Sequence, residues 1–399
     1  MNEPFLSAVP VLQQLEDAGY EAYFVGGSVR DYLLNKQISD VDIATSATPE
    51  EVKAIFPKTV DIGIEHGTVL VLFNLKSYEI TTFRTEGDYQ DFRRPKEVAF
   101  IRNLTDDLRR RDFTMNAMAM DRMGQVIDPF KGQQAIEQKI IQSVGHAKER
   151  FSEDALRMMR AVRFVSQLSF HIEEETMRAL KELTYLLENI AIERKRAEFE
   201  KLLAGDNWHE ALRIIAETNI CAYLPGLKNQ KSEIEKFLSY DGKNLTTSEM
   251  WSLLLFCLKL SEKAAESFLR DWRLSVKEIK HILSILMYLE RRLEKDWSVY
   301  DLFKAGSIVI ESVEKLYLTI KRLNDWTEIE RLLTTYQELP IKDSKDVAAT
   351  GTDLMKWFNR NGGPWVKESL VQIEQAILNG IVKNDKQNIK EWLLACSQN

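Results

Sequence analysis

The pattern of hydrophobic and polar positions changes character near Pro129. Before that residue, short apolar runs with strand spacing alternate with segments of helical period, which predicts a mixed α/β unit. Strands are expected at residues 21–25, 41–44, 69–73, 78–83 and 115–120. A first helix is expected over residues 28–34. A second begins at Thr48, where Thr48, Pro49 and Glu51 have the spacing of a capping box with proline in the first turn.

After Pro129, proline becomes rare and helical period dominates. Only Pro225 occurs before Pro340. Helices are expected over residues 155–165, 177–187, 197–203, 250–260 and 279–289. The pattern predicts an α+β protein in which a small mixed-sheet head is followed by an elongated all-helical neck, body and tail. We expect the head at residues 1–138, the neck at 139–204, the body at 205–275 and the tail at 276–399.

Length and composition agree with this organisation. A chain of 399 residues exceeds one ordinary core and predicts two to four domains. The chain has no apolar run long enough to span a membrane, and residues 1–10 lack the features of a signal peptide. Three widely spaced cysteines, Cys221, Cys257 and Cys396, argue against a disulfide framework and a zinc site. We therefore expect a cytoplasmic protein.

The formal net charge of −7 weighs mildly against nucleic acid as a partner. Binding depends on local patches rather than on the sum, however. Residues 93–111 hold seven Lys or Arg against three acids, Glu97, Asp106 and Asp107. A basic groove on an acidic protein therefore stays open as an interpretation.

Two carboxylates stand in a strand-like pattern in Ser39-Asp40-Val41-Asp42-Ile43. Strand geometry would place Asp40 and Asp42 on one face with Cα atoms about 6.6 Å apart. Such like charges repel, and two divalent cations about 4 Å apart would compensate them and suit in-line phosphoryl transfer. Glu79, on the expected strand 78–83, would complete the site. A lone Asp-x-Asp, however, more often marks a solvated strand face.

A double-glycine turn precedes these carboxylates in Phe24-Val25-Gly26-Gly27-Ser28-Val29-Arg30-Asp31. Gly26 and Gly27 would let a phosphate approach the backbone, where the N–H groups and dipole of a starting helix favour an anion. Arg30 could add a charge-assisted contact. The alternative is a tight turn that needs glycine for steric reasons alone. The combined spacing of turn and carboxylates is far more specific than either half.

Gly26-Gly27-x-x-Arg30-Asp31 followed by Asp40-x-Asp42 resembles the catalytic signature of the polymerase-beta nucleotidyltransferase superfamily. It is similar in particular to the class II tRNA nucleotidyltransferases, the bacterial CCA-adding enzymes and their poly(A) polymerase relatives. The resemblance covers nearly the whole chain. It implies template-independent addition of C, C and A to the 3′ end of tRNA from CTP and ATP, with release of pyrophosphate. It also implies two Mg²⁺ ions held by Asp40 and Asp42, with Glu79 as a third catalytic carboxylate.

The segment Arg110-Arg111-Asp112-Phe113-Thr114-Met115-Asn116-Ala117 resembles the family's second motif. The resemblance implies contacts with the triphosphate and ribose of the nucleotide. Arg111 suits a phosphate, whereas Asp112 and Asn116 suit the sugar hydroxyl that only a ribonucleotide carries. Without the family match, a basic helix start followed by a buried Phe113 is an equally good interpretation.

Glu153-Asp154-x-x-Arg157 matches the family's template motif. A carboxylate accepts hydrogen bonds and a guanidinium donates them. Cytosine and adenine each present an amino donor beside a ring acceptor, so Asp154 and Arg157 complement both bases, whereas uracil and guanine present the reverse pattern and are rejected. Seen alone, the two residues would be a helix start with an i,i+3 ion pair. Arg160 and Arg163 match further nucleotide contacts of the family, to phosphate.

Further segments resemble family features whose implied roles are less direct. Residues 192–203 match the last motif and are expected to brace the template helix, with Ala191 where a serine cap often stands. Residues 61–69 resemble the CCA-adding form rather than the poly(A) polymerase form. Residues 84–103 resemble a flexible loop that favours addition of the terminal A. Three motifs resemble a tail that grips tRNA through its backbone: Gly351-Thr352-Asp353-Leu354, Gly363-Pro364-Trp365 and Asn379-Gly380.

Three alternatives remain on the sequence alone. A poly(A) polymerase would share the chemistry but extend RNA with ATP without stopping. A CC-only or A-only enzyme would stall at one stage. From a different class, the chain could be a non-catalytic helical RNA-binding protein, although the complete set of Asp40, Asp42 and Glu79 argues against it.

Overall fold

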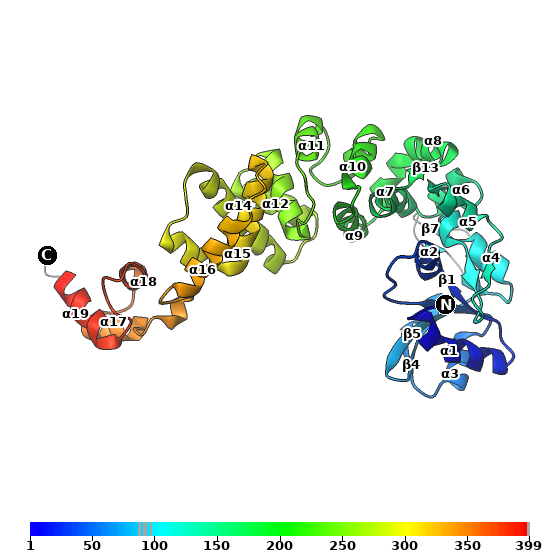
Figure 1. The fold of residues 1–399 in the computed structure, drawn as a ribbon, viewed down its shortest axis with the longest axis horizontal. Coiled ribbons are helices and arrows are strands. Elements are labelled where there is room, and N and C mark those ends of the chain that lie inside the picture. The colour runs from blue at the N-terminus through cyan, green and yellow to red at the C-terminus, as the bar shows by residue number, and fades with distance from the viewer. Residues whose placement is uncertain (87–88, 91–93, 96–97, 397–399) are drawn as a thin grey trace. The chain divides into compact units, whose positions relative to one another are not determined.

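The computed structural model describes residues 1–86, 89–90, 94–95 and 98–396. The chain forms two compact units, Met1–Asn229 and Gln230–Asn399. The first unit contains the mixed sheet and the second, over its described residues, contains only helices (Figure 1). The predicted class, a mixed-sheet head followed by helices, is confirmed. The finer division at residues 138, 204 and 275 stays a prediction.

The head is built on a seven-stranded sheet with the order β11-β10-β1-β2-β5-β4-β3. Neighbouring strands run antiparallel except β2 and β5, which are parallel. β4 and β5 form a hairpin whose turn residues, Asn74 and Leu75, both have positive φ, as a tight two-residue turn requires. The strands are β1 (Ala22–Val25), β2 (Asp42–Thr45), β3 (Thr59–Gly63), β4 (Thr68–Phe73), β5 (Lys76–Thr82), β10 (Ala119–Met120) and β11 (Val126–Ile127).

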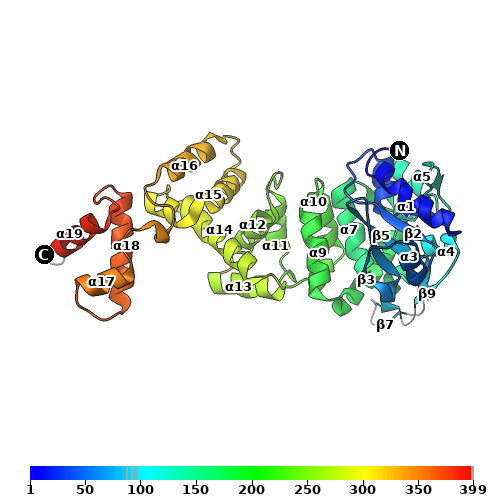
Figure 2. The same cartoon turned by 90° about the horizontal axis from the view of Figure 1, so that it is seen from below.

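The two faces of the sheet are covered differently. Helices α1 (Phe5–Asp17) and α3 (Pro49–Ile55) cover one face (Figure 2) and bury the main core with Phe24, Ile43 and Ile80. On the other face, α4 (Leu104–Arg109) contributes Leu104 and Leu108 to a smaller cluster with residues of β1, β2 and β10. The remaining head elements are α2 (Gly27–Leu33), η1 (Ile64–His66), η2 (Thr114–Asn116), α5 (Gly132–Glu137) and two short hairpins, β6 (Arg84–Glu86) with β9 (Val98–Phe100) and β7 (Tyr89–Gln90) with β8 (Arg94–Pro95).

A helical neck completes the first unit. Its central helix, α7 (Leu156–Leu168), buries Met159 and Val162 and packs against α9 (Ile192–Leu203) and α10 (Trp208–Glu217). Figures 1 and 2 both show α7 and α9 side by side. The other elements are β12 (Ile140–Ile141), α6 (Ala147–Glu153), β13 (His171–Ile172), α8 (Glu174–Leu183), η3 (Thr184–Asn189) and η4 (Ile220–Tyr223).

The second unit has its own hydrophobic core. Several of its helices begin at residues whose type and spacing mark a helix N-terminus. Capping boxes begin four of its helices, at Thr246, Ser275, Ser298 and Thr350. Gly306 interrupts α15 with φ 75° and ψ 161°, a conformation that favours glycine. The elements are α11 (Lys231–Leu238), α12 (Thr247–Leu258), α13 (Glu262–Asp271), α14 (Val276–Glu294), α15 (Val299–Lys321), α16 (Thr327–Glu338), η5 (Ser344–Asp346), α17 (Gly351–Trp357), α18 (Pro364–Leu378) and α19 (Lys386–Cys396).

Several expected elements differ from the structure in type or extent, including α9 and α14, which are longer than expected. The strand expected over residues 115–120 is reduced to Ala119–Met120, because Thr114–Asn116 forms a 3₁₀ turn. The helix expected over residues 177–187 is two elements, since α8 ends at Leu183 and a 3₁₀ helix follows. The strand expected over residues 41–44 begins only at Asp42. The expected mobile loop, residues 84–103, falls partly outside the described residues.

Candidate active site

Asp42 and Glu79 lie directly opposite each other on the parallel strands β2 and β5, and both are exposed. Asp40 precedes the strand and is also exposed, whereas Val41 and Ile43 are buried, which agrees with the expected alternation of sides along residues 40–43. Desolvation raises the pKa of Asp42, Arg111 opposes this change, and the charges of Glu79 and Asp40 raise the pKa further. The three carboxylates thus repel one another, and the exposed Asp42 is accessible to a cation from solvent.

The double-glycine turn brings an arginine beside these carboxylates. Gly26 has φ 74° and ψ −137°, and a Cβ atom there would lie 3.0 Å from Nη1 of Arg111 and 3.7 Å from Oδ2 of Asp42. Gly26, Arg111 and Asp42 therefore meet at one point, where a side chain on residue 26 would collide with Arg111. Nε of Arg111 is buried and has no hydrogen-bond partner among the described residues. Such an orphaned donor suits a phosphate oxygen.

A chain of hydrogen bonds connects the turn to the neck. Arg30 donates from Nη1 to Oδ1 of Asn116 (2.8 Å), and Asn116 donates to Oδ1 of Asp112 (3.0 Å). Asp112 accepts from Nε of Arg160 on α7 (2.7 Å). Desolvation alone would raise the pKa of Asp112, but the charge of Arg160 and several hydrogen bonds lower it to about 2, so this buried carboxylate stays ionised. A hydrogen-bonded network that includes the buried residues Arg30, Asn116 and Asp112 therefore connects the glycine turn to α7.

Three arginines surround the ring of Phe164. The guanidinium carbon of Arg163 lies 3.9 Å from the ring centroid, and those of Arg30 and Arg160 lie 5.1 and 5.6 Å away. Arg163 is buried and donates to Glu198 (2.5 Å) and to Gln167. Three of the four arginines predicted to bind the triphosphate are therefore gathered here, and each of them is engaged by a carboxylate: Arg30 by Asp31, Arg160 by Asp112 and Arg163 by Glu198.

Asp154 and Arg157 do not form the local ion pair that their spacing allows. Asp154 lies at the break between α6 and α7 and accepts two hydrogen bonds from Arg194 of α9 (2.8 and 3.2 Å). Arg157 donates instead to Glu153 (3.0 Å) and to the backbone oxygen of Arg110 (2.9 Å). The interpretation as a simple i,i+3 pair is therefore wrong. Asp154 and Arg157 are therefore each positioned by other residues and not by one another.

The bracing role predicted for residues 192–203 agrees with the contacts of α9. Besides Arg194, it supplies Glu198 to Arg163 of α7 and buries Lys195, whose Nζ donates to the backbone oxygens of Leu187 and Tyr223 (2.9 Å each). Ala191 is the N-cap and makes no side-chain cap bond, as its type predicts. Sequence reasoning grouped these residues but missed their individual partners, which lie in distant segments.

The basic stretch of residues 93–111 is largely neutralised where it is described. Arg109 pairs with Asp106, whereas Arg110 and Arg111 both pair with the buried Asp107. Arg102 pairs with Glu51 of α3. Arg93 and Lys96 lie outside the described residues. The basic groove that the sequence left open therefore stays a prediction, although Arg102 and Arg109 to Arg111 are all paired with acids.

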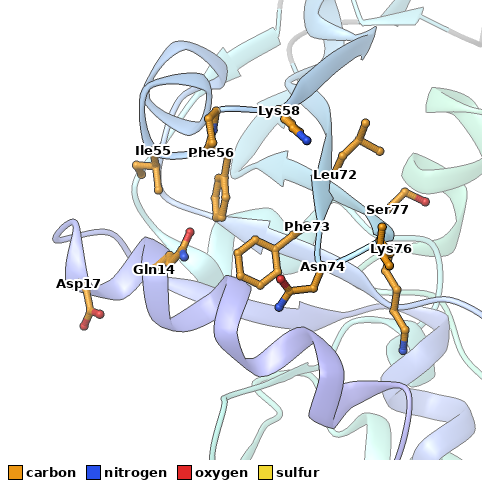
Figure 3. A pocket seen from close by; sticks show the side chains of 12 residues that line it. Gln14, Asp17, Ile55, Phe56, Lys58, Leu72, Phe73, Asn74, Lys76 and Ser77 are labelled. Atoms are coloured by element: carbon orange, nitrogen blue, oxygen red, sulfur yellow. The ribbon is translucent and has the colours of Figure 1, made fainter.

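A cavity of about 840 Å³ lies elsewhere in the head, between the ends of α1 and α3 and the β4–β5 turn (Figure 3). Its lining includes Phe56, Phe73 and Lys58, and none of the residues predicted for catalysis or nucleotide binding. A smaller cavity of about 310 Å³ adjoins Arg30 and Gln167 near the end of α7. Of these two cavities, the smaller one includes a predicted site residue, Arg30, in its lining.

The carboxylates of Asp42 and Glu79 suit a divalent cation whose remaining ligands come from the substrate and water. Within the described residues, no group of three His, Cys, Asp or Glu side chains is arranged to hold a metal ion by itself. Mg²⁺ typically takes one or two protein carboxylates and completes its shell with water and substrate phosphates. Asp42 and Glu79, adjacent and exposed, match that donor set.

A carboxylate pair on a mixed sheet, beside a glycine turn and clustered arginines, defines a nucleotidyltransferase head. Family models agree, since residues 22–142 match the poly A polymerase head domain. Residues 169–231 match a probable RNA and SrmB-binding site of polymerase A, and residues 243–393 match a putative tRNA nucleotidyltransferase domain 2. The chain is 46% identical over 396 residues to the CCA-adding enzyme of Bacillus cereus (strain AH820), covering 99% of each. It belongs to the family of CCA-adding enzymes.

Solved structures agree with this assignment. The chain is similar to the crystal structure of the Bacillus stearothermophilus CCA-adding enzyme in complex with CTP, with TM-score 0.92 and 44% identity over 100% of this chain and 98% of that one. The Thermotoga maritima CCA-adding enzyme complexed with tRNA shares the fold, with TM-score 0.60, 23% identity, and coverage of 99% and 96%. Membership of this nucleotidyltransferase family implies use of a divalent metal ion. Among the described helices, none has the length and apolar character needed to cross a membrane.

Proposed function

We propose that this protein adds C, C and A to the 3′ end of tRNA, using CTP and ATP and releasing pyrophosphate. The main support for the proposal is that two consecutive residues, Arg110 and Arg111, contact both the carboxylate site of the head and the proposed base-reading helix of the neck. Arg111 lies at the Gly26 turn beside Asp42, and the backbone oxygen of Arg110 holds Arg157 of α7. Carboxylates suited to phosphoryl transfer and a helix suited to reading a base edge are therefore anchored to the same two residues. We place the protein in the cytoplasm.

Asp40 and Asp42 would hold Mg²⁺ together with Glu79; the adjacent, exposed pair of Asp42 and Glu79 supports this assignment, and Asp40 would join them from just before β2. When bound, the two ions would activate the tRNA 3′ hydroxyl and stabilise the charge that develops on the α-phosphate. The backbone at Gly26 and Gly27, with Nε of Arg111, would receive the phosphates. Arg30, Arg160 and Arg163 would add positive charge, and each would exchange a carboxylate partner for phosphate. Asp112 and Asn116 would face the ribose.

Asp154 and Arg157 would choose the base. Three of the roughly four acceptor positions of a carboxylate are taken at Asp154, by the two Arg194 bonds and the Leu156 N–H. One position remains for the amino group of cytosine or adenine. Arg157 would donate to the neighbouring ring nitrogen. Uracil and guanine would place an acceptor against the carboxylate, which leaves buried polar groups mispaired.

The product of the reaction separates this proposal from its alternatives. A tRNA that lacks CCA is incubated with labelled CTP, with ATP, and with both, and the product is sequenced. We expect two C residues with CTP alone and a single CCA end with both nucleotides. A long A tail would indicate a poly(A) polymerase, a stop after CC or addition of A alone would indicate a partial enzyme, and no extension with intact tRNA binding would indicate a non-catalytic protein.

A further inference from the structure

A single row of side chains crosses the head sheet from the carboxylates to its edge. Each residue is the direct cross-strand partner of the next, and the row contains Asp42 (β2), Glu79 (β5), Leu70 (β4) and Val60 (β3). Direct partners on neighbouring strands point to the same face. Strands are about 4.8 Å apart, so Leu70 is one strand and Val60 two strands beyond Glu79. The row therefore begins with the two carboxylates and continues toward the sheet edge with two apolar side chains.

This part of the sheet face is largely exposed near the edge strand, whereas Leu70, one strand further in, is half-buried. The main core lies on the opposite face, where Val69, Val71 and Ile80 alternate with the row. The cluster around α4 covers the same face as the row over β1, β2 and β10 and reaches Phe83, just after β5, but it includes no residue of β3 or β4. Val60 and Leu72 are each 45% exposed. Figure 3 shows Phe73 turned toward α1 and Leu72 on the other side of the hairpin. An exposed apolar patch of this kind marks a contact surface.

The nucleotide site lies on the other side of the carboxylates. Gly26 follows β1, and Arg111 reaches Asp42 from that direction, so the candidate phosphate contacts are on the β1 side of β2. In-line displacement needs the attacking and leaving oxygens on opposite sides of the phosphorus. If the leaving pyrophosphate lies toward β1, the attacking hydroxyl arrives from the side of β5 and β4.

We propose that Leu70 and Val60 form the platform on which the 3′-terminal nucleotide of the tRNA rests, with its 3′ hydroxyl at Asp42 and Glu79. This inference rests on the proposed function. The chemistry of the patch fits its occupant, because the terminal nucleotide changes at each addition and its contacts must tolerate any base. Apolar side chains contact sugars and base faces without reading hydrogen-bonding edges. Thr68 and Thr81, whose hydroxyls lie 3.1 Å apart on the same face, border the platform.

A double variant, Val60→Ser with Leu70→Ser, tests the platform. We expect kcat/KM for tRNA to fall about tenfold or more, because the attacking hydroxyl is misplaced, while KM for CTP stays unchanged. Leu70→Met should keep near-normal activity, since it preserves the apolar contact. The matched control is Leu6→Ser, a residue on α1 that is 51% exposed and covers the other face. Unchanged kcat/KM for tRNA in a folded double variant would overturn the proposal.

Photochemical crosslinking gives a second readout that does not depend on the variants folding. A tRNA without CCA that carries 4-thiouridine as its 3′-terminal nucleotide is irradiated with the wild-type protein, and the adduct is mapped by mass spectrometry. We expect the adduct on β3 or β4. An adduct confined to α7 or α9 would refute the platform. If the wild-type protein adds CCA normally, such a result leaves the proposed function intact, whereas an inactive wild type refutes the function itself.

Discussion

The Asp42→Asn variant is expected to lose CCA addition by about 10³-fold or more while it keeps its fold and its affinity for tRNA. Asp42 stands at the centre of the carboxylate group, next to Glu79 across the parallel strand pair and beside Arg111. An amide keeps the shape of the side chain but removes the charge that holds a divalent cation, and this loss is worth several kcal/mol in the transition state. Single-turnover rates and tRNA binding by fluorescence anisotropy measure the two effects separately.

The same substitution makes a prediction about stability without metal. Desolvation and then the charges of Glu79 and Asp40 raise the pKa of Asp42 and outweigh the opposing effect of Arg111, so the folded protein disfavours the charged carboxylate. Removing that charge should therefore leave the melting temperature of the metal-free protein unchanged or higher. Asp61→Asn is the matched control, since Asp61 is an exposed aspartate on β3 of the same sheet that pairs with Lys53. It should retain full activity. Turnover at the wild-type rate in Asp42→Asn would refute the assignment of the metal site.

Replacing Asp154 by alanine is expected to weaken the choice of base more than the binding of tRNA. The remaining acceptor position of Asp154 is the group proposed to receive the amino hydrogen of C or A, and without it uracil no longer meets a mispaired carboxylate. We expect UTP incorporation relative to CTP to rise by about 10²-fold. Competition between labelled nucleotides on one tRNA measures this ratio.

The control for this experiment replaces an exposed carboxylate that lies a few residues before Asp154 in the sequence. Glu149→Gln, in the first turn of α6, changes an exposed charge only a few residues earlier and should leave the ratio unchanged. Arg194 is partly exposed, so water can satisfy it when Asp154 is removed, and a general collapse of the neck is not expected. Preserved discrimination in Asp154→Ala would rule out the template role.

Local features of the fold were predictable from the sequence because their causes are local. The capping box at Thr48 and Glu51 depends on residues within a few positions of each other. The 3₁₀ turn at Thr114–Asn116 was not predictable from the sequence, because Asn116 accepts a hydrogen bond from Arg30, which lies in a distant segment. Tertiary contacts override short-range propensity at such positions.

In the candidate site, too, the sequence indicated the roles of individual residues, whereas their long-range partners became visible only in the structure. The residue types and their spacing indicated phosphoryl transfer at Asp42 and base reading at Asp154. Spacing alone suggested that Asp154 pairs with Arg157, whereas its partner is Arg194, 40 residues away. Likewise, Arg160 pairs with Asp112, 48 residues away. Helical periodicity reports only neighbours three or four residues apart, so these cross-element pairs required the fold.

The central claim is that one bound nucleotide connects the carboxylates of the sheet to the base-reading residues of the neck. A structure of this protein with CTP and Mg²⁺ tests it most directly. We expect the α-phosphate beside Asp42 and Glu79, with the N4 amino group of cytosine at Asp154 and its N3 at Arg157. A cytosine bound away from Asp154 and Arg157, with the triphosphate still at Asp42, would contradict the claim.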